Sequence, residues 1–134
     1  MTAVVADTHT IVWYVAQPEQ LSENASLALD RATSTGQSIY VSAITIVEIC
    51  YLVEKRRLPE LVLQRLLNVS DAADGVVVTV PLNRIIAETL QQIPRNTVPD
   101  MPDRIIAATA LHLNLPLVTR DSRIQALTEI ETIW

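Results

Sequence analysis

Short runs rich in valine and isoleucine alternate along the whole chain with longer segments of helical spacing, and this alternation limits the possible folds more than any other feature. The runs predict strands at 4–6, 38–42, 76–80 and 115–119, with a further edge strand at 132–134. Because neighbouring parallel strands are joined through crossover helices, this order indicates an α/β sandwich around a mostly parallel sheet. A hydrophobic share of 49% fits the fold, since strands covered on both faces are continuously apolar.

The segments between the runs predict the helices of one domain spanning 1–134, a length typical of a single domain. Ser22 is a typical helix N-cap, and Pro59 opens a later helix. Three prolines, at 94, 99 and 102, predict a stiff loop that ends before Asp103. The helices are expected at 8–16, 22–34, 43–57, 60–73, 82–92, 103–113 and 121–127.

Several classes of function are excluded by what the chain lacks. Its two glycines, Gly36 and Gly75, are too far apart for a dinucleotide-binding motif or a phosphate-binding P-loop. Its single cysteine, Cys50, permits neither an internal disulfide nor a cysteine-based zinc site. The formal net charge of −5 means that any role with nucleic acid needs a local basic patch.

The chain shows no sign of a membrane or export segment. Its N-terminal residues lack the basic region of a signal peptide. The longest apolar stretch, 43–53, is shorter than the roughly 18 residues that suggest a membrane span. We therefore expect a cytoplasmic protein with no membrane contact.

Four carboxylates stand where a parallel sheet would bring them together. Asp7 ends the first strand, Asp121 follows the fourth, and Asp103 begins a helix. Each aspartate alone is explained more simply as a helix N-cap. Sites in such sheets, however, gather outside the carboxyl ends of the strands. Glu48 adds a carboxylate inside an otherwise apolar helix, where an unpaired charge is unfavourable, although a solvated stripe or an arginine partner would also explain it.

Carboxylates gathered in this way repel one another, and a bound cation is the simplest means of keeping them ionised at neutral pH. Oxygen ligands favour hard cations, here Mg²⁺ or Mn²⁺, which keep some of their water ligands. Such an ion would position a water for in-line attack on a phosphorus atom and offset the charge that develops there. The residues themselves thus point to hydrolysis of phosphodiester bonds.

The remaining residues with chemical potential carry a weaker signal. His9 and His112 lack the H-E-x-x-H spacing of zinc hydrolases, and we expect both to be structural or surface residues. Cys50 is expected to be a small core residue rather than a nucleophile. The pair Trp13 and Tyr14 is expected in the core or on a dimer face.

Four segments follow one another in an order that resembles PIN-domain nucleases, and especially the VapC-type toxin ribonucleases. They are VVADT at 4–8, SAITIVE at 42–48, DMPDRIIAATA at 100–110 and LVTRD at 117–121. The resemblance implies a three-layer α/β/α fold and a metal-dependent endoribonuclease that acts as the toxin of a toxin-antitoxin pair. It also implies a homodimer, neutralised by a small antitoxin protein that covers the acidic cleft.

The resemblance assigns the catalytic quartet, by position, to Asp7, Glu48, Asp103 and Asp121. It makes Asp7 and Asp103 direct metal ligands, while Glu48 and Asp121 would bind the ion directly or through water.

Three further residues are expected to support these carboxylates. Thr8 and Thr119 are placed to hydrogen-bond neighbouring carboxylates, although helix capping and strand packing explain them equally well. Asp100 would either support the metal ligands or act as a turn residue that stiffens the proline loop.

Basic residues near the carboxylates would supply the phosphate-binding charge. Arg104 and Arg120 are the expected contacts to RNA phosphates, with 55–57 and Arg123 as flanks. An ordinary solvated surface explains 55–57 equally well. Since aromatic residues make up only 4% of the chain, recognition of RNA is expected to depend on its shape and backbone.

Two other functions stay open from the sequence. One is a non-catalytic binding module that uses the PIN fold for contacts with protein or RNA. The other is a phosphotransfer enzyme with an aspartyl-phosphate, which also places an aspartate after its first strand. His9 argues against a haloacid-dehalogenase-type enzyme, because such enzymes have a second aspartate at that position.

Overall fold

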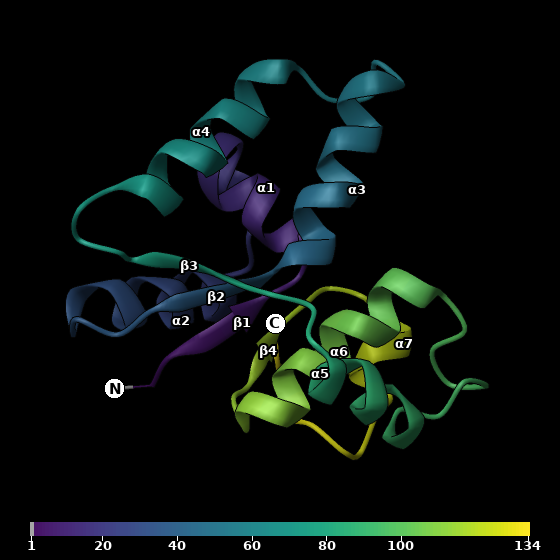
Figure 1. The fold of residues 1–134 in the computed structure, drawn as a ribbon. Helices are drawn as coiled ribbons and strands as arrows, with labels where there is room; N and C mark the ends of the chain where they lie inside the picture. Colours follow the sequence, from purple (N-terminus) through teal and green to yellow (C-terminus); the bar gives the residue numbers. More distant parts are fainter. Residues whose placement is uncertain (1) are drawn as a thin grey trace.

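A five-stranded, fully parallel sheet lies between two layers of helices in the computed structural model, which describes residues 2–134 (Figure 1). The strand order is β3-β2-β1-β4-β5, so the first strand is central. This arrangement confirms the predicted three-layer α/β/α fold. The strands are β1 (Val4–Ala6), β2 (Ile39–Ser42), β3 (Val77–Val80), β4 (Leu117–Val118) and β5 (Thr132–Ile133).

A helix or a pair of helices lies in every connection between consecutive strands, as parallel pairing requires. Within residues 2–134, no helix combines the length and the apolar character that crossing a membrane would need. The helices are α1 (Thr8–Ala16), α2 (Glu23–Ser34), α3 (Ala43–Glu54), α4 (Glu60–Asp71), α5 (Arg84–Thr89), α6 (Met101–Leu113) and α7 (Ser122–Gln125), with 3₁₀ turns at Pro18–Gln20 and Leu90–Gln92.

The two faces of the sheet bury separate cores because successive side chains of a strand point to opposite sides. In β1, Val4 and Ala6 pack with α1, α2 and α4, whereas Val5 packs with α5, α6 and α7. The same division appears in Figure 1, with α1 and α4 above the sheet and α5, α6 and α7 below it on the right. Both faces of β1 are thus sealed, which explains its continuous apolar sequence.

The chain order reverses beside β1. Strands β2 and β3 extend the sheet on one side of β1, while β4 and β5 extend it on the other. A crevice opens outside the carboxyl ends of the strands at such a switch point. Asp7 directly follows β1, and Thr119 directly follows β4, so both residues border this crevice.

Several predicted boundaries differ from the structure. Helix α3 ends at Glu54 rather than at residue 57, because Arg56 takes a left-handed backbone with a φ of 58°. Helix α6 begins two residues before Asp103, since Pro102 fits within a first helical turn, where its missing N–H is not needed. Strand β4 pairs only through Leu117 and Val118, a shorter segment than the predicted 115–119.

Candidate active site

All four candidate carboxylates line one cavity of about 800 Å³ at the carboxyl end of the sheet. Asp7 comes from the end of β1, Glu48 from α3, Asp103 from α6, and Asp121 from the loop before α7. Of the three supporting residues, Thr8 lines the cavity and Asp100 and Thr119 lie just outside it. The fold therefore gathers residues that are up to 114 positions apart in the chain, from Asp7 to Asp121.

Thr119 links two of the carboxylates. Its hydroxyl donates a hydrogen bond to Oδ2 of Asp7 and accepts one from the backbone N–H of Asp121 at 3.0 Å. Thr119 is completely buried and Asp7 is 5% exposed, so neither side chain is free to reorient. Thr119 thereby fixes the positions of Asp7 and Asp121, which follow the first and fourth strands, relative to each other.

A second pair of threonines orients Glu48. The hydroxyl of Thr8 donates to Oε1 of Glu48 at 2.6 Å and lies 3.0 Å from the hydroxyl of Thr45. A hydroxyl has one proton, and the proton of Thr8 goes to Glu48, so Thr45 is the donor in the contact between the threonines. Thr45 was not identified from the sequence, where it is one polar residue within an apolar helix and carries no distinctive pattern.

Of the three aspartates that the sequence suggested as N-caps, Asp7 and Asp121 cap helices, and both also line the cavity. Asp7 accepts the N–H of Thr10 at 3.0 Å, and Asp121 accepts those of Arg123 and Ile124 at 2.8 and 3.0 Å. The capping explanation is wrong for Asp103, because Asp100 caps α6 through the N–H of Asp103 at 3.1 Å. Asp103 therefore does not cap a helix.

Burial and crowding make the cavity unfavourable for negative charge. Burial is the main cause that raises the pKa of Asp103 to about 7, and the charges of Asp100, Asp121, Glu48 and Asp7 add to it. Burial also raises the pKa of Glu48, against the opposing effect of the hydrogen bond from Thr8. Within residues 2–134 the one ion pair joins Arg84 to Glu88, so none of the four carboxylates forms an ion pair with a basic side chain.

These observations fit a divalent cation by the chemistry of the donors. Four carboxylates are the anionic groups that line the cavity, and a cation would relieve the repulsion that helps raise the pKa of Asp103. Within residues 2–134, however, no three acidic, histidine or cysteine side chains stand close enough together to hold an ion as they are. The carboxylates surround the cavity and would have to approach one another to coordinate an ion.

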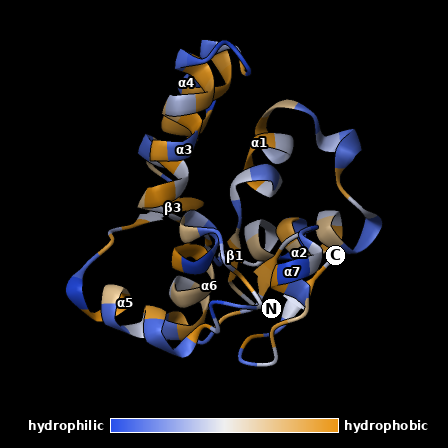
Figure 2. Cartoon of the chain, turned by 90° about the vertical axis from the view of Figure 1, so that its right-hand side faces the viewer, coloured by the Kyte–Doolittle hydropathy of each residue, from blue (hydrophilic) through white to orange (hydrophobic). Residues whose placement is uncertain are grey.

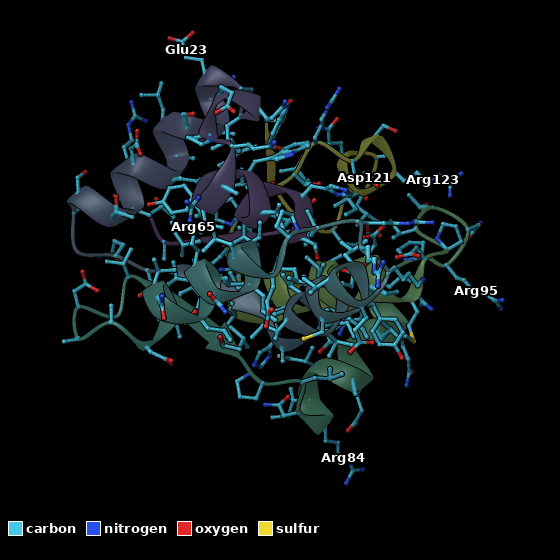
Figure 3. All side chains as sticks on the ribbon, turned by 90° about the horizontal axis from the view of Figure 1, so that it is seen from above. Glu23, Arg65, Arg84, Arg95, Asp121 and Arg123 are labelled. Atoms are coloured by element: carbon cyan, nitrogen blue, oxygen red, sulfur yellow. The ribbon has the colours of Figure 1, made fainter. Side chains whose placement is uncertain are left out.

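The basic residues divide into those that reach the cavity and those that do not. Arg120 lines it, and so does Lys55 from the predicted flank 55–57. Arg104 does not: its guanidinium donates to the carbonyl oxygens of Leu90 and Ile93, both at 2.9 Å. Arg104 thus uses Nε and Nη2 to hold α6 to the preceding loop, and its expected contact with an RNA phosphate stays a prediction. Arg123, Arg84 and Arg95 project outward from the body in Figure 3.

Trp13 of α1 has a place beyond the one expected. Trp13 is half-buried and packs partly against the core, but it also lines the cavity together with His9. The sequence of α1 is apolar on all sides, so its pattern could not show which aromatic residue faces the site. Tyr14, the neighbouring aromatic residue, does not line the cavity.

The comparisons with known proteins agree with this architecture. A family profile described as the PIN domain matches residues 4–130. Ribonuclease VapC22 of Mycobacterium tuberculosis (strain ATCC 25618 / H37Rv) is 33% identical over 126 residues, which make up 94% of this chain and 92% of that protein.

Solved structures show the same fold at lower identity. A chain of VapBC2 from Rickettsia felis, bound to a DNA fragment from its promoter, has a TM-score of 0.73 at 15% identity, over 97% of this chain and 96% of that one. A chain of FitAcB from Neisseria gonorrhoeae has a TM-score of 0.64 at 21% identity, over 96% and 95%. Since the profile covers nearly the whole sequence and a relative is 33% identical over most of its length, the chain belongs to the PIN domain family.

Proposed function

We propose that this protein is a metal-dependent endoribonuclease that hydrolyses RNA phosphodiester bonds, and that it is the toxin of a type II toxin-antitoxin pair. The observation that carries the proposal is the cavity itself, which four carboxylates line without forming an ion pair in residues 2–134. The similarity to a protein named ribonuclease VapC22 supports RNA as the substrate.

In this proposal Asp7 and Asp103 hold a Mg²⁺ or Mn²⁺ ion, and Glu48 and Asp121 contact it directly or through water. The bound ion supplies Lewis-acid stabilisation of the charge on the phosphate and makes a nearby water more acidic. Thr119 fixes the Oδ2 atom of Asp7, and Thr8 fixes the Oε1 atom of Glu48, so both carboxylates are oriented before substrate binds. Arg120, which lines the same cavity, attracts the RNA backbone.

The partners in this proposal are an antitoxin protein and a second copy of the chain. Solved structures with this fold include a toxin-antitoxin complex from Klebsiella pneumoniae, at 22% identity and a TM-score of 0.60. Apolar side chains are exposed on the neighbouring helices α3 and α4, where Val47, Tyr51 and Leu61 are 48%, 59% and 53% accessible. Figure 2 shows these two helices rising together above the rest of the chain, with apolar residues on both. Exposed apolar area of this kind is typical of a protein contact.

The hydrogen bonds of Asp7 support this function over the phosphotransfer alternative. Each oxygen of Asp7 accepts one hydrogen bond, from Thr10 or from Thr119, and keeps a second lone pair for a cation. Those bonds stabilise the carboxylate and lower its nucleophilicity, so they favour a ligand role. A non-catalytic binding module stays an alternative that only an activity measurement separates from the nuclease.

The test is cleavage of total cellular RNA by the purified protein with Mn²⁺ or Mg²⁺, beside the same reaction in EDTA. Asp7→Asn removes one charge and keeps a good N-cap for α1, so the variant should fold and lose cleavage. Asp74→Asn removes one charge from an exposed turn and serves as the matched control, which should cut like the unchanged protein.

Cleavage that survives EDTA or Asp7→Asn would contradict the metal-dependent mechanism. If the folded protein, free of antitoxin, cuts no RNA with either ion, the binding module becomes the better explanation.

A further inference from the structure

A group of side chains with no part in the metal site faces the same cavity. His9 and Trp13 lie four residues apart on α1, and their rings are 5.6 Å apart between centroids. The guanidinium carbon of Arg120 lies 5.8 Å from the centre of the Trp13 ring. We call these three residues, His9, Trp13 and Arg120, the aromatic shelf.

We propose that the aromatic shelf stacks one base of a single-stranded RNA next to the phosphate that is cut. The inference rests on the proposed function and deepens it, because it assigns a binding site for the base to residues outside the acidic quartet. Aromatic faces combined with a positively charged side chain bind single-stranded nucleic acid through stacking and backbone contacts.

The position of Trp13 suits a neighbouring nucleotide rather than the reacting one. Trp13 follows Asp7 by six residues on the same helix, which corresponds to about 9 Å along the helix axis. Both side chains line one cavity, so a strand whose phosphate lies among the carboxylates passes the shelf. One rigid helix thus fixes the spacing between a metal ligand and the stacking ring.

The ring of Trp13 is also held in place. Trp134 packs against it with centroids 5.9 Å apart and planes tilted by 52°, and Trp134 does not line the cavity. Trp134 therefore restrains Trp13 from outside the cavity, while the part-exposed Trp13 ring lines the cavity beside His9 and Arg120. A restrained ring loses little entropy when a base stacks on it, which favours binding.

The same chemistry occurs a second time in the cavity. The Nζ atom of Lys55 lies 5.9 Å from the centre of the Tyr51 ring, and both residues line the cavity from α3. Two aromatic residues, each paired with a cation, beside an acidic centre favour a strand of bases and phosphates over an apolar protein segment. An apolar protein segment would leave the two positive charges of Lys55 and Arg120 without a partner.

The experiment measures binding in EDTA, where a metal-dependent nuclease does not cut. The probes are a mixed-sequence single-stranded RNA of about eight nucleotides and an abasic oligonucleotide of the same length. Trp13→Leu keeps apolar volume and removes the aromatic face, so it should weaken binding of the RNA by roughly 5- to 150-fold, the range for loss of one stacked base. Binding of the abasic probe should not change, and Trp13→Phe should fall between the two proteins.

Tyr14→Leu makes the same replacement one residue away, at a side chain that does not line the cavity, and should bind both probes normally. Thermal unfolding checks that each variant is folded. If Trp13→Leu does not fold, Trp134→Phe leaves Trp13 as the single tryptophan, and its fluorescence should be quenched by the RNA but not by the abasic probe.

The proposal is wrong if Trp13→Leu weakens binding of both probes equally or leaves RNA binding unchanged. It is also wrong if the RNA does not quench the fluorescence of Trp13. Unchanged RNA binding would assign the surface to a protein contact instead. The proposed function fails separately, when the unchanged protein does not cut RNA with Mn²⁺, so the two failures are distinguishable.

Discussion

At the scale of single residues, the site depends on side chains that serve structure and chemistry together. Asp7 caps α1 with one oxygen and accepts the Thr119 hydroxyl with the other. Asp121 likewise caps α7 while it faces the cavity. Asp103 differs, because it caps no helix and has a pKa raised to about 7. The protein therefore bears an unfavourable charge at Asp103 without a compensating structural contact.

Asp103 should make the metal-free protein less stable as the pH rises. Its pKa is 3.8 when unperturbed and about 7 in the fold, so between these values unfolding releases a proton. The free energy of unfolding then falls with increasing pH across this window, and the loss is complete above it. Asp103→Asn removes the effect, so in EDTA the variant should gain stability relative to the unchanged protein between pH 4 and pH 8.

Thermal unfolding of both proteins in EDTA across this pH range measures the difference, and titrating groups that do not interact with Asp103 cancel in the comparison. Added Mn²⁺ should raise the midpoint of the unchanged protein more than that of the variant. A difference in midpoint that stays constant with pH would show that Asp103 ionises normally.

At the scale of elements, most of the fold could be predicted because capping residues and prolines mark where helices begin and end. Helix α1 begins and ends where the sequence predicted, between Asp7 and the segment before Pro18. The predicted boundaries are wrong where the local conformation of the backbone determines the end of a helix. The end of α3 depends on the left-handed backbone of Arg56. Arginine rarely takes this conformation, so the sequence does not predict it. The start of α6 depends on which of two aspartates caps the helix.

The cap of α6 gives a prediction for Asp100. Asp100→Ala removes the side-chain acceptor for the N–H of Asp103 and should lower the free energy of unfolding by about 1 kcal/mol. Asp100→Ser removes the same charge but keeps a capping oxygen, so it should retain most of the stability. Denaturant unfolding of the two variants separates the capping role from the electrostatic one. Equal stability of the two would mean that the cap contributes nothing.

At the scale of the whole molecule, the parallel topology places the site. Reversal of the strand order beside β1 brings the ends of β1 and β4 to one crevice, and α3 and α6 add Glu48 and Asp103 to it. This much could be predicted from the order of strands and carboxylates. The sequence could not show that Arg104 binds backbone carbonyls or that Trp13 lines the cavity, because both depend on how separate elements pack.

The distribution of charge leads to the last prediction, on the salt dependence of RNA binding. The chain has a net charge of −5, and the basic residues that line the cavity are Lys55 and Arg120. For single strands, the logarithm of the binding constant falls with the logarithm of salt concentration by about 0.7 for each neutralised phosphate. Two contacts therefore predict a slope of about −1.4 in EDTA.

Arg120→Gln should reduce that slope by about half, since one of two phosphate contacts is lost. Arg84→Gln is the matched control, because Arg84 points outward and pairs with Glu88, and its slope should equal that of the unchanged protein. Titration of a labelled single-stranded RNA at several salt concentrations measures all three slopes. A much steeper slope that Arg120→Gln leaves unaltered would place the RNA on the outer surface, where Arg56, Arg57 and Arg123 supply the charge instead of the cavity.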